Sequence, residues 1–324
     1  MRALVQERYG TDDVLELREV AVPALGPDDV LVRVHAAGID QGVWHLMAGL
    51  PYLVRLAGHG LRAPKARVRG SDVAGCVEAV GERVTRLAPG DEVFGTCAGA
   101  FAEYATATSD KLVSKPENLT FEQAAAVPTS ALTALQGLWD TGGVRDGHRA
   151  LIVGAAGGVG TFAVQLAKVF GAEVTGVCST DKVDLVRSIG ADGVIDYTRG
   201  DFADADERWD VILDLAGNRS LSHLRRALAA RGTLVIVGGE GGGRWIGGTD
   251  RQLRALALSP FVRQRLRSLV ATVTAADLYY LKELIEAGRV VPVVDRTFAL
   301  SEASDAIRYL RTGHARGKVV VTVG

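Results

Sequence analysis

The chain has 324 residues, of which 48% are hydrophobic and 23% charged, and its formal net charge is −1. This length favours about two domains, and the near-neutral charge excludes a global electrostatic footprint for nucleic acid. No run of about 18 apolar residues occurs, which excludes a membrane-spanning helix, and we expect no membrane partner. The three cysteines are odd in number and widely spaced, and the opening residues lack the apolar core of a signal peptide. Both observations suit a cytoplasmic protein or a stripped mature chain, and we expect the first because it is simpler.

The first third of the chain is predicted to be rich in β-strands. Alternating apolar residues indicate a strand at 30–34, and small or β-branched residues indicate strands at 72–80 and 92–94. Gly81 and the sequence Pro89-Gly90-Asp91 provide turns between them. Short strands separated by such turns are typical of a small barrel-like β domain.

The middle of the chain follows a different pattern. After Thr120 the sequence FEQAAAVPTSALTALQGLW predicts a helix that is interrupted near Pro128. From Ala150 onward, apolar runs alternate with amphipathic segments. We expect strands at 150–155, 173–178, 193–197, 209–217, 233–239 and 268–273, and helices at 161–170, 182–189 and 221–230. This alternation predicts a doubly wound parallel sheet with helices on both faces.

The last part of the chain returns to mixed elements. We expect a helix at 278–286, a strand region at 290–300 and a helix that runs from its N-cap, Ser301, to Leu310. The apolar sequence KVVVTV closes the chain as a strand. Because it has no partner in the α/β block, we expect it to return to the first domain.

A glycine-rich segment gives the strongest functional signal. In ALIVGAAGGVG, an apolar strand leads into Gly154, Gly157 and Gly160, and a helix follows. Small residues let the chain turn tightly, let the backbone approach a pyrophosphate and let the helix pack on the strand. The helix N-terminus then offers N–H groups to the phosphates. Between a strand and a helix, this spacing indicates a dinucleotide site rather than a structural turn.

The end of the following strand bears on which dinucleotide is bound. An acidic residue there favours a free ribose 2′-hydroxyl. Here Ser179 is suited to donate to a 2′-phosphate and Lys182 to supply positive charge, which favours NADPH. Asp181 argues against this if its side chain points inward, and Ser179 with Thr180 also suits a plain helix N-cap.

Several motifs in this order resemble the medium-chain dehydrogenase/reductase superfamily, and within it the zinc-independent, zeta-crystallin-like quinone oxidoreductases. The motifs are MRALV, AAGID, GSDVAGCVEAVG, PGDEVFG, GAFAEYA, AAAVPTSALTALQGL, AGGVG and GADGVIDY, and they span nearly the whole chain. The resemblance implies a GroES-like β-rich catalytic domain at 1–124 and 290–324 and a Rossmann domain at 125–289. It also implies a cofactor in the cleft between them.

The resemblance carries over cofactor contacts at matching positions. It places the pyrophosphate near Gly157, Gly158 and Val159, and the 2′-phosphate near Ser179, Lys182 and Tyr197. It places the nicotinamide near Thr133, Gly238 and Phe261. Lys318 in the tail is a further family position near the cofactor.

Ligand counting argues against zinc. Catalytic zinc in this superfamily is held by a cysteine, a histidine and a further cysteine or acid, and such a site needs three protein ligands. Asp40 stands at the first ligand position, and Ser71 replaces the histidine of the Gly-His-Glu motif. The lobe that holds structural zinc would need four cysteines, and only Cys97 is present there. We therefore expect no metal.

Without zinc, hydride transfer to a conjugated carbon is favoured, because the charge spreads onto a distal carbonyl. We therefore expect NADPH-dependent reduction of a quinone or an α,β-unsaturated carbonyl compound. Asp40, His45 and Tyr52 are the candidate catalytic residues. Asp40 departs from the asparagine common in quinone reductases, and a carboxylate near nicotinamide favours the oxidised ring. Tyr52 and His45 equally suit plain packing roles in their segment.

Two basic clusters have both a functional and a structural interpretation. Residues 55–69 carry basic side chains and no acid, so they form either a basic lip that attracts a phosphorylated ligand or a solvated loop. The second cluster, Arg263, Arg265 and Arg267, is interpreted as an exposed helix face.

Other functions remain open at this stage. An enoyl-thioester reductase, a tailoring reductase of secondary metabolism and a non-catalytic NADPH-binding sensor also suit these residues. In the family the last Rossmann strand pairs across a two-fold axis. The apolar sequence SLVATV suits such pairing, so we expect a homodimer.

Overall fold

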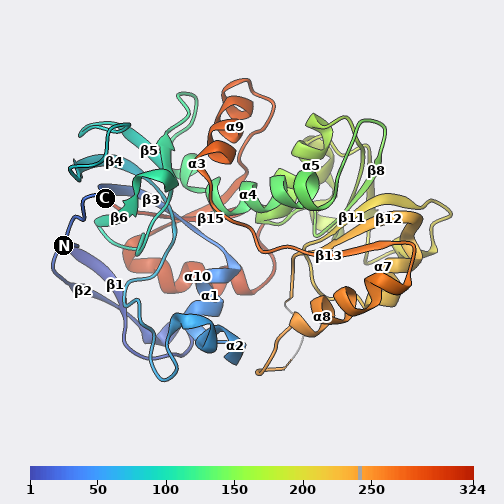
Figure 1. The fold of residues 1–324 in the computed structure, drawn as a ribbon, viewed down its shortest axis with the longest axis horizontal. Coiled ribbons are helices and arrows are strands. Elements are labelled where there is room, and N and C mark those ends of the chain that lie inside the picture. Colours follow the sequence, from blue (N-terminus) through green and yellow to red (C-terminus); the bar gives the residue numbers. More distant parts are fainter. Residues whose placement is uncertain (240–242) are drawn as a thin grey trace. The chain divides into compact units, whose positions relative to one another are not determined.

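A computed structural model describes residues 1–239 and 243–324 and divides the chain into two compact units. The first unit comprises 1–132 and 273–324, and the second comprises 133–272. Figure 1 shows the elements of each. The second unit lies within the range 125–289 that was expected for the Rossmann domain.

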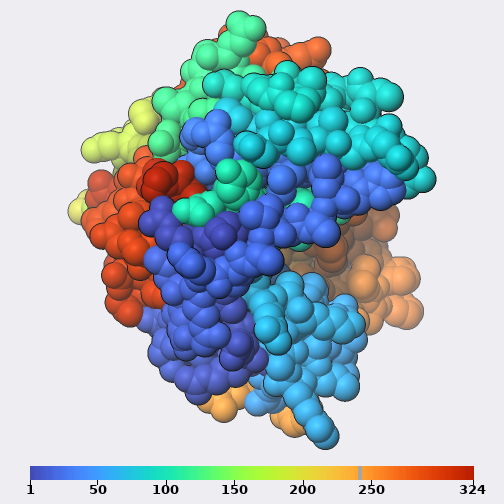
Figure 2. Space-filling model, turned by 90° about the vertical axis from the view of Figure 1, so that its left-hand side faces the viewer, coloured from blue at the N-terminus to red at the C-terminus, as the bar shows by residue number. Residues whose placement is uncertain are grey.

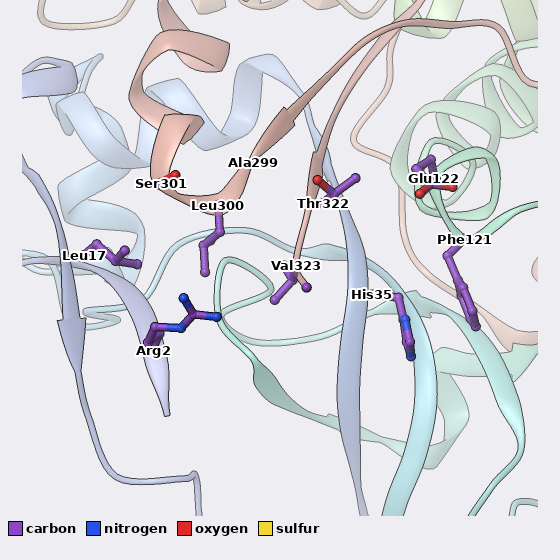
Figure 3. A pocket seen from close by; sticks show the side chains of 11 residues that line it. Arg2, Leu17, His35, Phe121, Glu122, Ala299, Leu300, Ser301, Thr322 and Val323 are labelled. Carbon is purple, nitrogen blue, oxygen red and sulfur yellow. The ribbon is translucent and has the colours of Figure 1, made fainter.

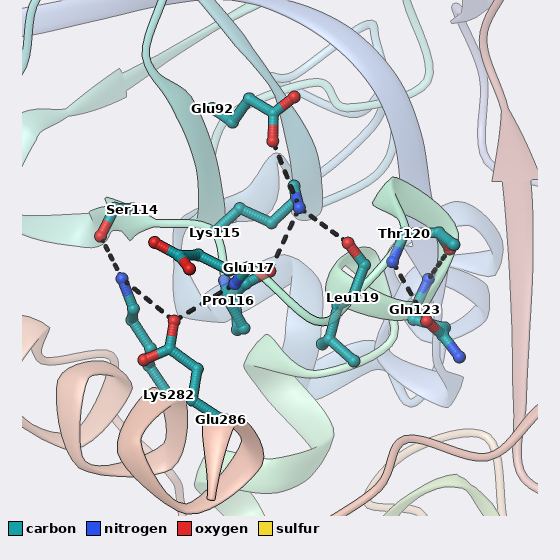
Figure 4. Close-up of polar contacts among 10 residues, drawn as sticks. All are labelled: Glu92, Ser114, Lys115, Pro116, Glu117, Leu119, Thr120, Gln123, Lys282 and Glu286. Atoms are coloured by element: carbon teal, nitrogen blue, oxygen red, sulfur yellow. Dashed lines mark hydrogen bonds and ion pairs between the residues drawn. The ribbon is translucent and has the colours of Figure 1, made fainter. Parts of the chain in front are cut away.

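Helix α9 (Ala275–Glu286) explains why residues 273–289 belong to the first unit. The Nζ of Lys282 donates to the Oγ of Ser114 on β7 (Leu112–Ser114) at 2.6 Å. The Nδ2 of Asn118 donates to the carbonyl oxygen of Ile285 at 2.8 Å. These bonds hold α9 on the first unit, and Figure 4 shows the Lys282 contacts.

The first unit is built around β3 (Asp29–Ile39), which pairs antiparallel with β4 (Asp72–Val80), β6 (Tyr104–Thr108) and β15 (Lys318–Thr322). The remaining strands of this seven-stranded sheet are β5 (Glu92–Thr96), β7 and β14 (Val294–Ala299), and β1 (Arg2–Gln6) pairs with β2 (Leu15–Glu19) in a separate sheet. The helices are α1 (Gln41–Ala48), α2 (Tyr52–Val54), α3 (Phe121–Ala125), α9 and α10 (Ala303–Arg311). The β-rich first domain and the return of the last strand to it are confirmed.

Apolar alternation positions β3 in the core of the first unit. Val30, Val32 and Val34 are buried, whereas Arg33 between them is exposed. The core continues through Phe101 and Met47. This period of two is what makes the segment a half-buried strand.

The second unit contains a six-stranded, fully parallel sheet with strand order β10-β9-β8-β11-β12-β13. The strands are β8 (Arg149–Val153), β9 (Glu173–Cys178), β10 (Gly193–Asp196), β11 (Trp209–Asp214), β12 (Leu228–Ile236) and β13 (Arg265–Ser268). The helices are α5 (Gly158–Val169), α6 (Val183–Ser188), α7 (Leu221–Ala227) and α8 (Thr249–Leu258), and α4 (Pro128–Gln136) leads into the unit. Figure 1 shows α5 on one side of this sheet and α7 and α8 on the other. The expected doubly wound α/β sheet is confirmed.

Three details differ from the sequence expectation. The sixth strand is β13, so the segment 268–273 only touches its end. Arg265 and Arg267 are exposed on that strand and not on a helix, because fully buried Leu266 between them gives a period of two. Ser301 lies inside a 3-10 turn, and α10 begins after Glu302, whose carboxylate accepts the N–H of Ala299 at 2.9 Å.

None of the helices within 1–239 and 243–324 is both long and apolar enough to cross a membrane.

Candidate functional site

The glycine-rich turn lies between β8 and α5. Gly154 has a φ of +90°, in the region that favours glycine. A Cβ on Gly160 would lie 2.1 Å from the carbonyl oxygen of Gly154, so the helix start approaches the turn too closely for any other residue. Gly157 is the N-cap of α5, and a Cβ there would meet only the oxygen of Gly154, at 3.5 Å. Position 157 therefore borders open space, with Gly158 and Val159 beginning the helix.

This turn can bind a phosphate. The first-turn N–H groups of a helix lack intrahelical acceptors, and the helix dipole adds partial positive charge there. The turn also sits at the carboxyl edge of the sheet, beside the point between β8 and β11 where the strand order reverses. In doubly wound sheets, ligands bind at this position. The structure thus brings Gly157, Gly158 and Val159 together where a pyrophosphate is expected to bind.

The corner after β9 holds charges of both signs. The Oγ of Ser179 donates to the Oδ1 of Asp181 at 2.5 Å, so Asp181 engages the hydroxyl that the sequence assigned to a phosphate. Lys182 is buried. The pKa of Cys178 is raised to about 11 by burial and by Asp196 and Asp181, while Lys182 and Arg187 oppose the rise. The corner thus combines two cations, Lys182 and Arg187, with the acids Asp181 and Asp196.

Tyr197 lies beside this corner because β10 pairs with β9. Its backbone N–H donates to the carbonyl oxygen of Cys178 at 3.1 Å, and its side chain is half exposed. The Oγ1 of Thr180 donates to the Oδ2 of Asp196 at 2.5 Å and lies 2.9 Å from the Oγ1 of Thr198. The hydrogen bonds that Asp196 accepts from Thr180 and Thr198 hold its pKa below the ordinary value. The ends of both strands are thus held together by side chains on the surface.

A buried ion pair lies at the carboxyl end of β11. Asp214 is fully buried, and the Nη2 of Arg251 on α8 donates to its carboxylate. Burial raises the pKa of Asp214, and the Arg251 charge opposes this rise. A Cβ on Gly238, just after β12, would lie 2.2 Å from the carbonyl oxygen of Leu215, so the backbone approaches closely there. Sequence reasoning missed the pair, although Asp214 ends a buried strand; Arg251 had no sequence signal.

Two other residues expected at the nicotinamide occupy contrasting places. Thr133 is buried in α4. Phe261 lies in the 3-10 turn at 259–261 and is 84% exposed. Phe261 is therefore a surface side chain of the second unit.

In the first unit, the three candidate catalytic residues lie in one short segment. Asp40 is the N-cap of α1, and its Oδ1 accepts the N–H of Val43 at 3.1 Å. The Nδ1 of His45 lies 2.9 Å from the carbonyl oxygen of Leu50. Because a carbonyl only accepts, this nitrogen carries the proton, and Nε2 of the neutral ring is an acceptor. Tyr52 begins α2.

A buried ion pair that the sequence did not reveal lies near Asp40. Asp72 is 0% and Lys318 2% exposed, and the Lys318 Nζ lies 3.4 Å from the Asp72 Oδ2. The other carboxylate oxygen accepts the Oγ1–H and, at 3.1 Å, the N–H of Thr129. Burial raises the pKa of Asp72 to about 6, against the effect of Lys318 and with that of Asp40. Lys318, which the resemblance placed near the cofactor, thus directs its ammonium group into the first unit.

A zinc ion does not fit these residues. No group of three or more histidine, cysteine or acidic side chains is placed to hold a metal within the described ranges. Asp72 already accepts from Thr129 and Lys318. Burial and the negative charge of Asp72 raise the pKa of Cys97, so this thiol is protonated and is a poor ligand.

One cavity of about 350 Å³ lies in the first unit (Figure 3). Arg2, Leu17, His35, Phe121, Leu300 and Val323 are among its lining residues. The His35 ring stacks on Phe121 with centroids 4.3 Å apart, and the Nε of Arg2 already donates to Glu103 at 2.7 Å. None of the sequence-predicted site residues lines it, so it does not contribute to the candidate site.

Known proteins resemble the chain over its whole length. A family model described as an alcohol dehydrogenase GroES-like domain matches residues 26–117, and one described as a zinc-binding dehydrogenase matches 189–321. The 2-methylene-furan-3-one reductase of Solanum lycopersicum is 37% identical over 99% of this chain and 79% of its own. The chloroplastic NADPH-dependent alkenal/one oxidoreductase of Arabidopsis thaliana is 36% identical over the same shares. The solved quinone oxidoreductase of Coxiella burnetii superposes with a TM-score of 0.87 at 29% identity, covering 100% of this chain and 99% of the other.

Proposed function

Because this chain belongs to the medium-chain dehydrogenase/reductase family, in its quinone oxidoreductase group, we propose that it reduces quinones or α,β-unsaturated carbonyl compounds with NADPH, without zinc. The observation that carries this proposal is the glycine turn before α5. Gly160 closes the turn on Gly154 at a distance only glycine allows, and Gly157 leaves the helix start open to a pyrophosphate.

The chemistry requires a hydride, a conjugated acceptor and a proton. The bound nicotinamide supplies the hydride. With an enone, the new C–H bond forms at the β-carbon and the electron pair moves to the carbonyl oxygen as an enolate. A proton at the α-carbon then completes the saturated ketone. The compound named in the Solanum relative, a methylene group conjugated to a ketone, is an acceptor of this class.

We propose Asp40, His45 and Tyr52 as the residues of the first unit that act in proton transfer and in the electrostatics of the site. Neutral His45 has its proton on Nδ1, engaged with Leu50, so donation from this ring requires the imidazolium form. Tyr52→Phe removes one donor without removing the ring. A loss of kcat with a changed solvent isotope effect supports a proton-transfer role, and an unchanged kcat excludes it for Tyr52.

The proposed preference for NADPH is supported by two basic residues of the segment that follows β9: Lys182 at the N-cap of α6 and Arg187 in its last turn. Asp181 opposes this preference because it repels a phosphate and holds the Ser179 hydroxyl. Asp181→Asn is therefore expected to raise kcat/KM for NADPH by about tenfold relative to NADH. Asp184→Asn on α6 is the matched control and should leave this ratio unchanged. An unchanged ratio in Asp181→Asn would exclude a 2′-phosphate at this corner.

Turnover with a panel of acceptors tests the proposed function. Oxidation of NADPH is followed with a naphthoquinone, a simple enone and an enoyl thioester, with NADH in parallel. Gly157→Asp places a carboxylate in the open space before α5 and should abolish turnover, whereas Gly157→Ala should retain most of it. No oxidation by the native chain with any acceptor would contradict the proposal, and turnover with the thioester alone would reassign it to an enoyl-thioester reductase.

We also propose a homodimer located in the cytoplasm. Strand β13 is an edge of the six-stranded sheet, and Trp245, Phe261 and Val270 are exposed apolar side chains along the sequence around it. An unpaired edge with apolar neighbours favours pairing with a second copy. Light scattering coupled to gel filtration tests the dimer, and cell fractionation tests the location.

A further inference from the structure

The segment from Arg55 to Arg67, here called the 55–67 loop, presents leucines and basic side chains together on the surface of the first unit. Leu56 is 70% and Leu61 65% exposed. Arg62, Lys65 and Arg67 are exposed as well. The light-blue segment that stands out on the face in Figure 2 belongs to this part of the chain. Exposed large apolar side chains of this kind mark interaction sites when they occur together.

The loop is held in shape by named contacts. The Arg55 guanidinium lies 4.3 Å from the centroid of the Tyr9 ring and 4.8 Å from that of Tyr52, and its Nε donates to the carbonyl oxygen of Gly49 at 2.9 Å. The hydroxyl of Tyr9 lies 2.9 Å from the carbonyl oxygen of His59. Two of the basic residues that the sequence analysis grouped in the lip, Arg55 and Arg69, are therefore packed and do not project; Arg69 is buried.

A second turn of the loop is closed by its own backbone. The N–H of Lys65 donates to the carbonyl oxygen of His59 at 3.0 Å. Gly60 has a φ of +107°, and a Cβ there would lie 2.1 Å from the carbonyl oxygen of Ala63, so this tight turn requires glycine. Leu56 and Leu61 lie on the two turns that meet at His59. Several specific contacts thus fix the backbone of a loop whose two leucines are exposed to solvent.

The segment that carries the leucines has charges of one sign only. No acidic residue occurs between Asp40 and Asp72. Two acidic residues of the segment that follows β1 are already in ion pairs. Glu7 lies 3.0 Å from Arg18, and Asp13 lies 3.6 Å from Arg8. Among residues 1–239 and 243–324, no ion pair engages Arg62, Lys65 or Arg67. Leucines flanked by such basic residues complement a surface that is negative outside and apolar beneath, which is the surface of an anionic lipid bilayer.

We propose that the 55–67 loop docks the protein on anionic membranes, with Leu56 and Leu61 inserted between the lipid headgroups and Arg62, Lys65 and Arg67 against the lipid phosphates. The sequence analysis expected no membrane partner because it found no apolar run long enough to span a bilayer. A protein can also bind the surface of a membrane without such a helix. Such docking would bring the protein to a phase in which apolar acceptors concentrate.

Vesicle flotation tests this proposal without any need for turnover. The native chain should float with phosphatidylcholine vesicles that contain about one-third phosphatidylglycerol, and not with phosphatidylcholine alone or at high salt. Leu56→Ser with Leu61→Ser should lower partitioning by about tenfold or more. Arg62→Glu, Lys65→Glu and Arg67→Glu together should lower it by about a hundredfold.

Matched controls separate the loop from general effects. Val22→Ser with Leu25→Ser removes two exposed apolar side chains elsewhere in the first unit and should leave partitioning within about twofold. Lys111→Glu, Arg145→Glu and Arg231→Glu together make the same change in net charge at other exposed positions and should cost only a few-fold. A polarity-sensitive probe on Leu56→Cys should shift to the blue on addition of the anionic vesicles, and the same probe on Val22→Cys should not.

Four results would overturn the proposal. They are a native chain that stays with the soluble fraction, a leucine variant that floats like the native chain, a control charge variant that loses as much as the loop variant, and a probe at position 56 that does not shift. A change of oligomeric state in the leucine variant on gel filtration would assign the loop to contact with a second copy instead. Unchanged thermal melting shows that each surface variant is folded.

Discussion

Replacing Lys318 with methionine should destabilise the first unit, and the loss should depend on pH. The side chain of Lys318 is 2% exposed, and its ammonium lies 3.4 Å from the fully buried carboxylate of Asp72. Lys318→Met keeps a long side chain but leaves that carboxylate without its cation. Removing one partner of a buried pair costs about 3–5 kcal/mol, because the other charge remains buried. At neutral pH we therefore expect the free energy of unfolding to fall by about that amount.

The sign of the pH dependence follows from Asp72. Its folded pKa of about 6 lies above the ordinary 3.8, so ionising it costs about 3 kcal/mol of stability, a loss that develops as pH rises from 3.8 to 6. The charge of Lys318 lowers the pKa of Asp72, so Lys318→Met raises this pKa further. In the variant, stability therefore continues to fall as the pH rises above 6. Near pH 5, Asp72 is mostly protonated in both proteins, and the difference between them should shrink.

Urea unfolding at about pH 7.5 and about pH 5 measures this difference. Lys168→Met is the matched control, because Lys168 is partly exposed and lies 2.8 Å from Asp192; its cost should stay near 1 kcal/mol or below at both pH values. Asp72→Asn combined with Lys318→Met should recover part of the loss of Lys318→Met at neutral pH. A penalty for Lys318→Met that is below about 1 kcal/mol, or that is the same at both pH values, would refute the reasoning.

Three further predictions concern other named contacts. Gly160→Ala should abolish binding of reduced nicotinamide cofactor in a fluorescence titration, because its Cβ would lie 2.1 Å from a carbonyl oxygen; a normal dissociation constant would contradict the tight turn. Asp40→Ala should lower the free energy of unfolding in urea by about 1 kcal/mol, because the N–H of Val43 loses its acceptor at the start of α1. Asp40→Asn keeps an acceptor and should lower it by only about a few tenths of a kcal/mol; equal costs would show that the cap does not stabilise α1. Arg251→Met should cost about 3–5 kcal/mol by leaving Asp214 buried without a cation, and thermal melting that is unchanged would mean that the pair contributes nothing.

The fold was predictable where the hydrophobic period was unambiguous. The Val30–Val34 alternation and the apolar runs of the α/β block gave strands close to those in the structure, because in both cases burial follows the period directly. The prediction failed at β13, where an arginine-rich segment contains one buried residue, Leu266, and charge obscured the period of two. It also failed at Ser301, because the chain forms a 3-10 turn at 300–302 before α10, and Glu302 occupies the N-cap position of α10.

The candidate site was predictable where backbone geometry restricts the residue type. Gly154 and Gly160 stood out in the sequence because a tight turn and a close helix start admit only glycine. The ion pair of Asp72 with Lys318 was not predictable, because it joins β4 to the last strand, and no local pattern links residues so far apart. The engagement of Ser179 by Asp181 depends on side-chain rotamers, which the sequence leaves undetermined.

Isotope transfer tests the central claim most directly. Wild-type protein is given NADPH deuterated at C4 of the nicotinamide on the transferred face, together with a simple enone, and the saturated ketone is analysed by mass spectrometry and NMR. Reduction by hydride transfer predicts one deuterium at the β-carbon and a solvent-derived hydrogen at the α-carbon. Saturated ketone without deuterium at the β-carbon when cofactor labelled on either face is used, or cofactor oxidation without saturated product, would contradict the claim that this chain is a nicotinamide-dependent enone and quinone reductase.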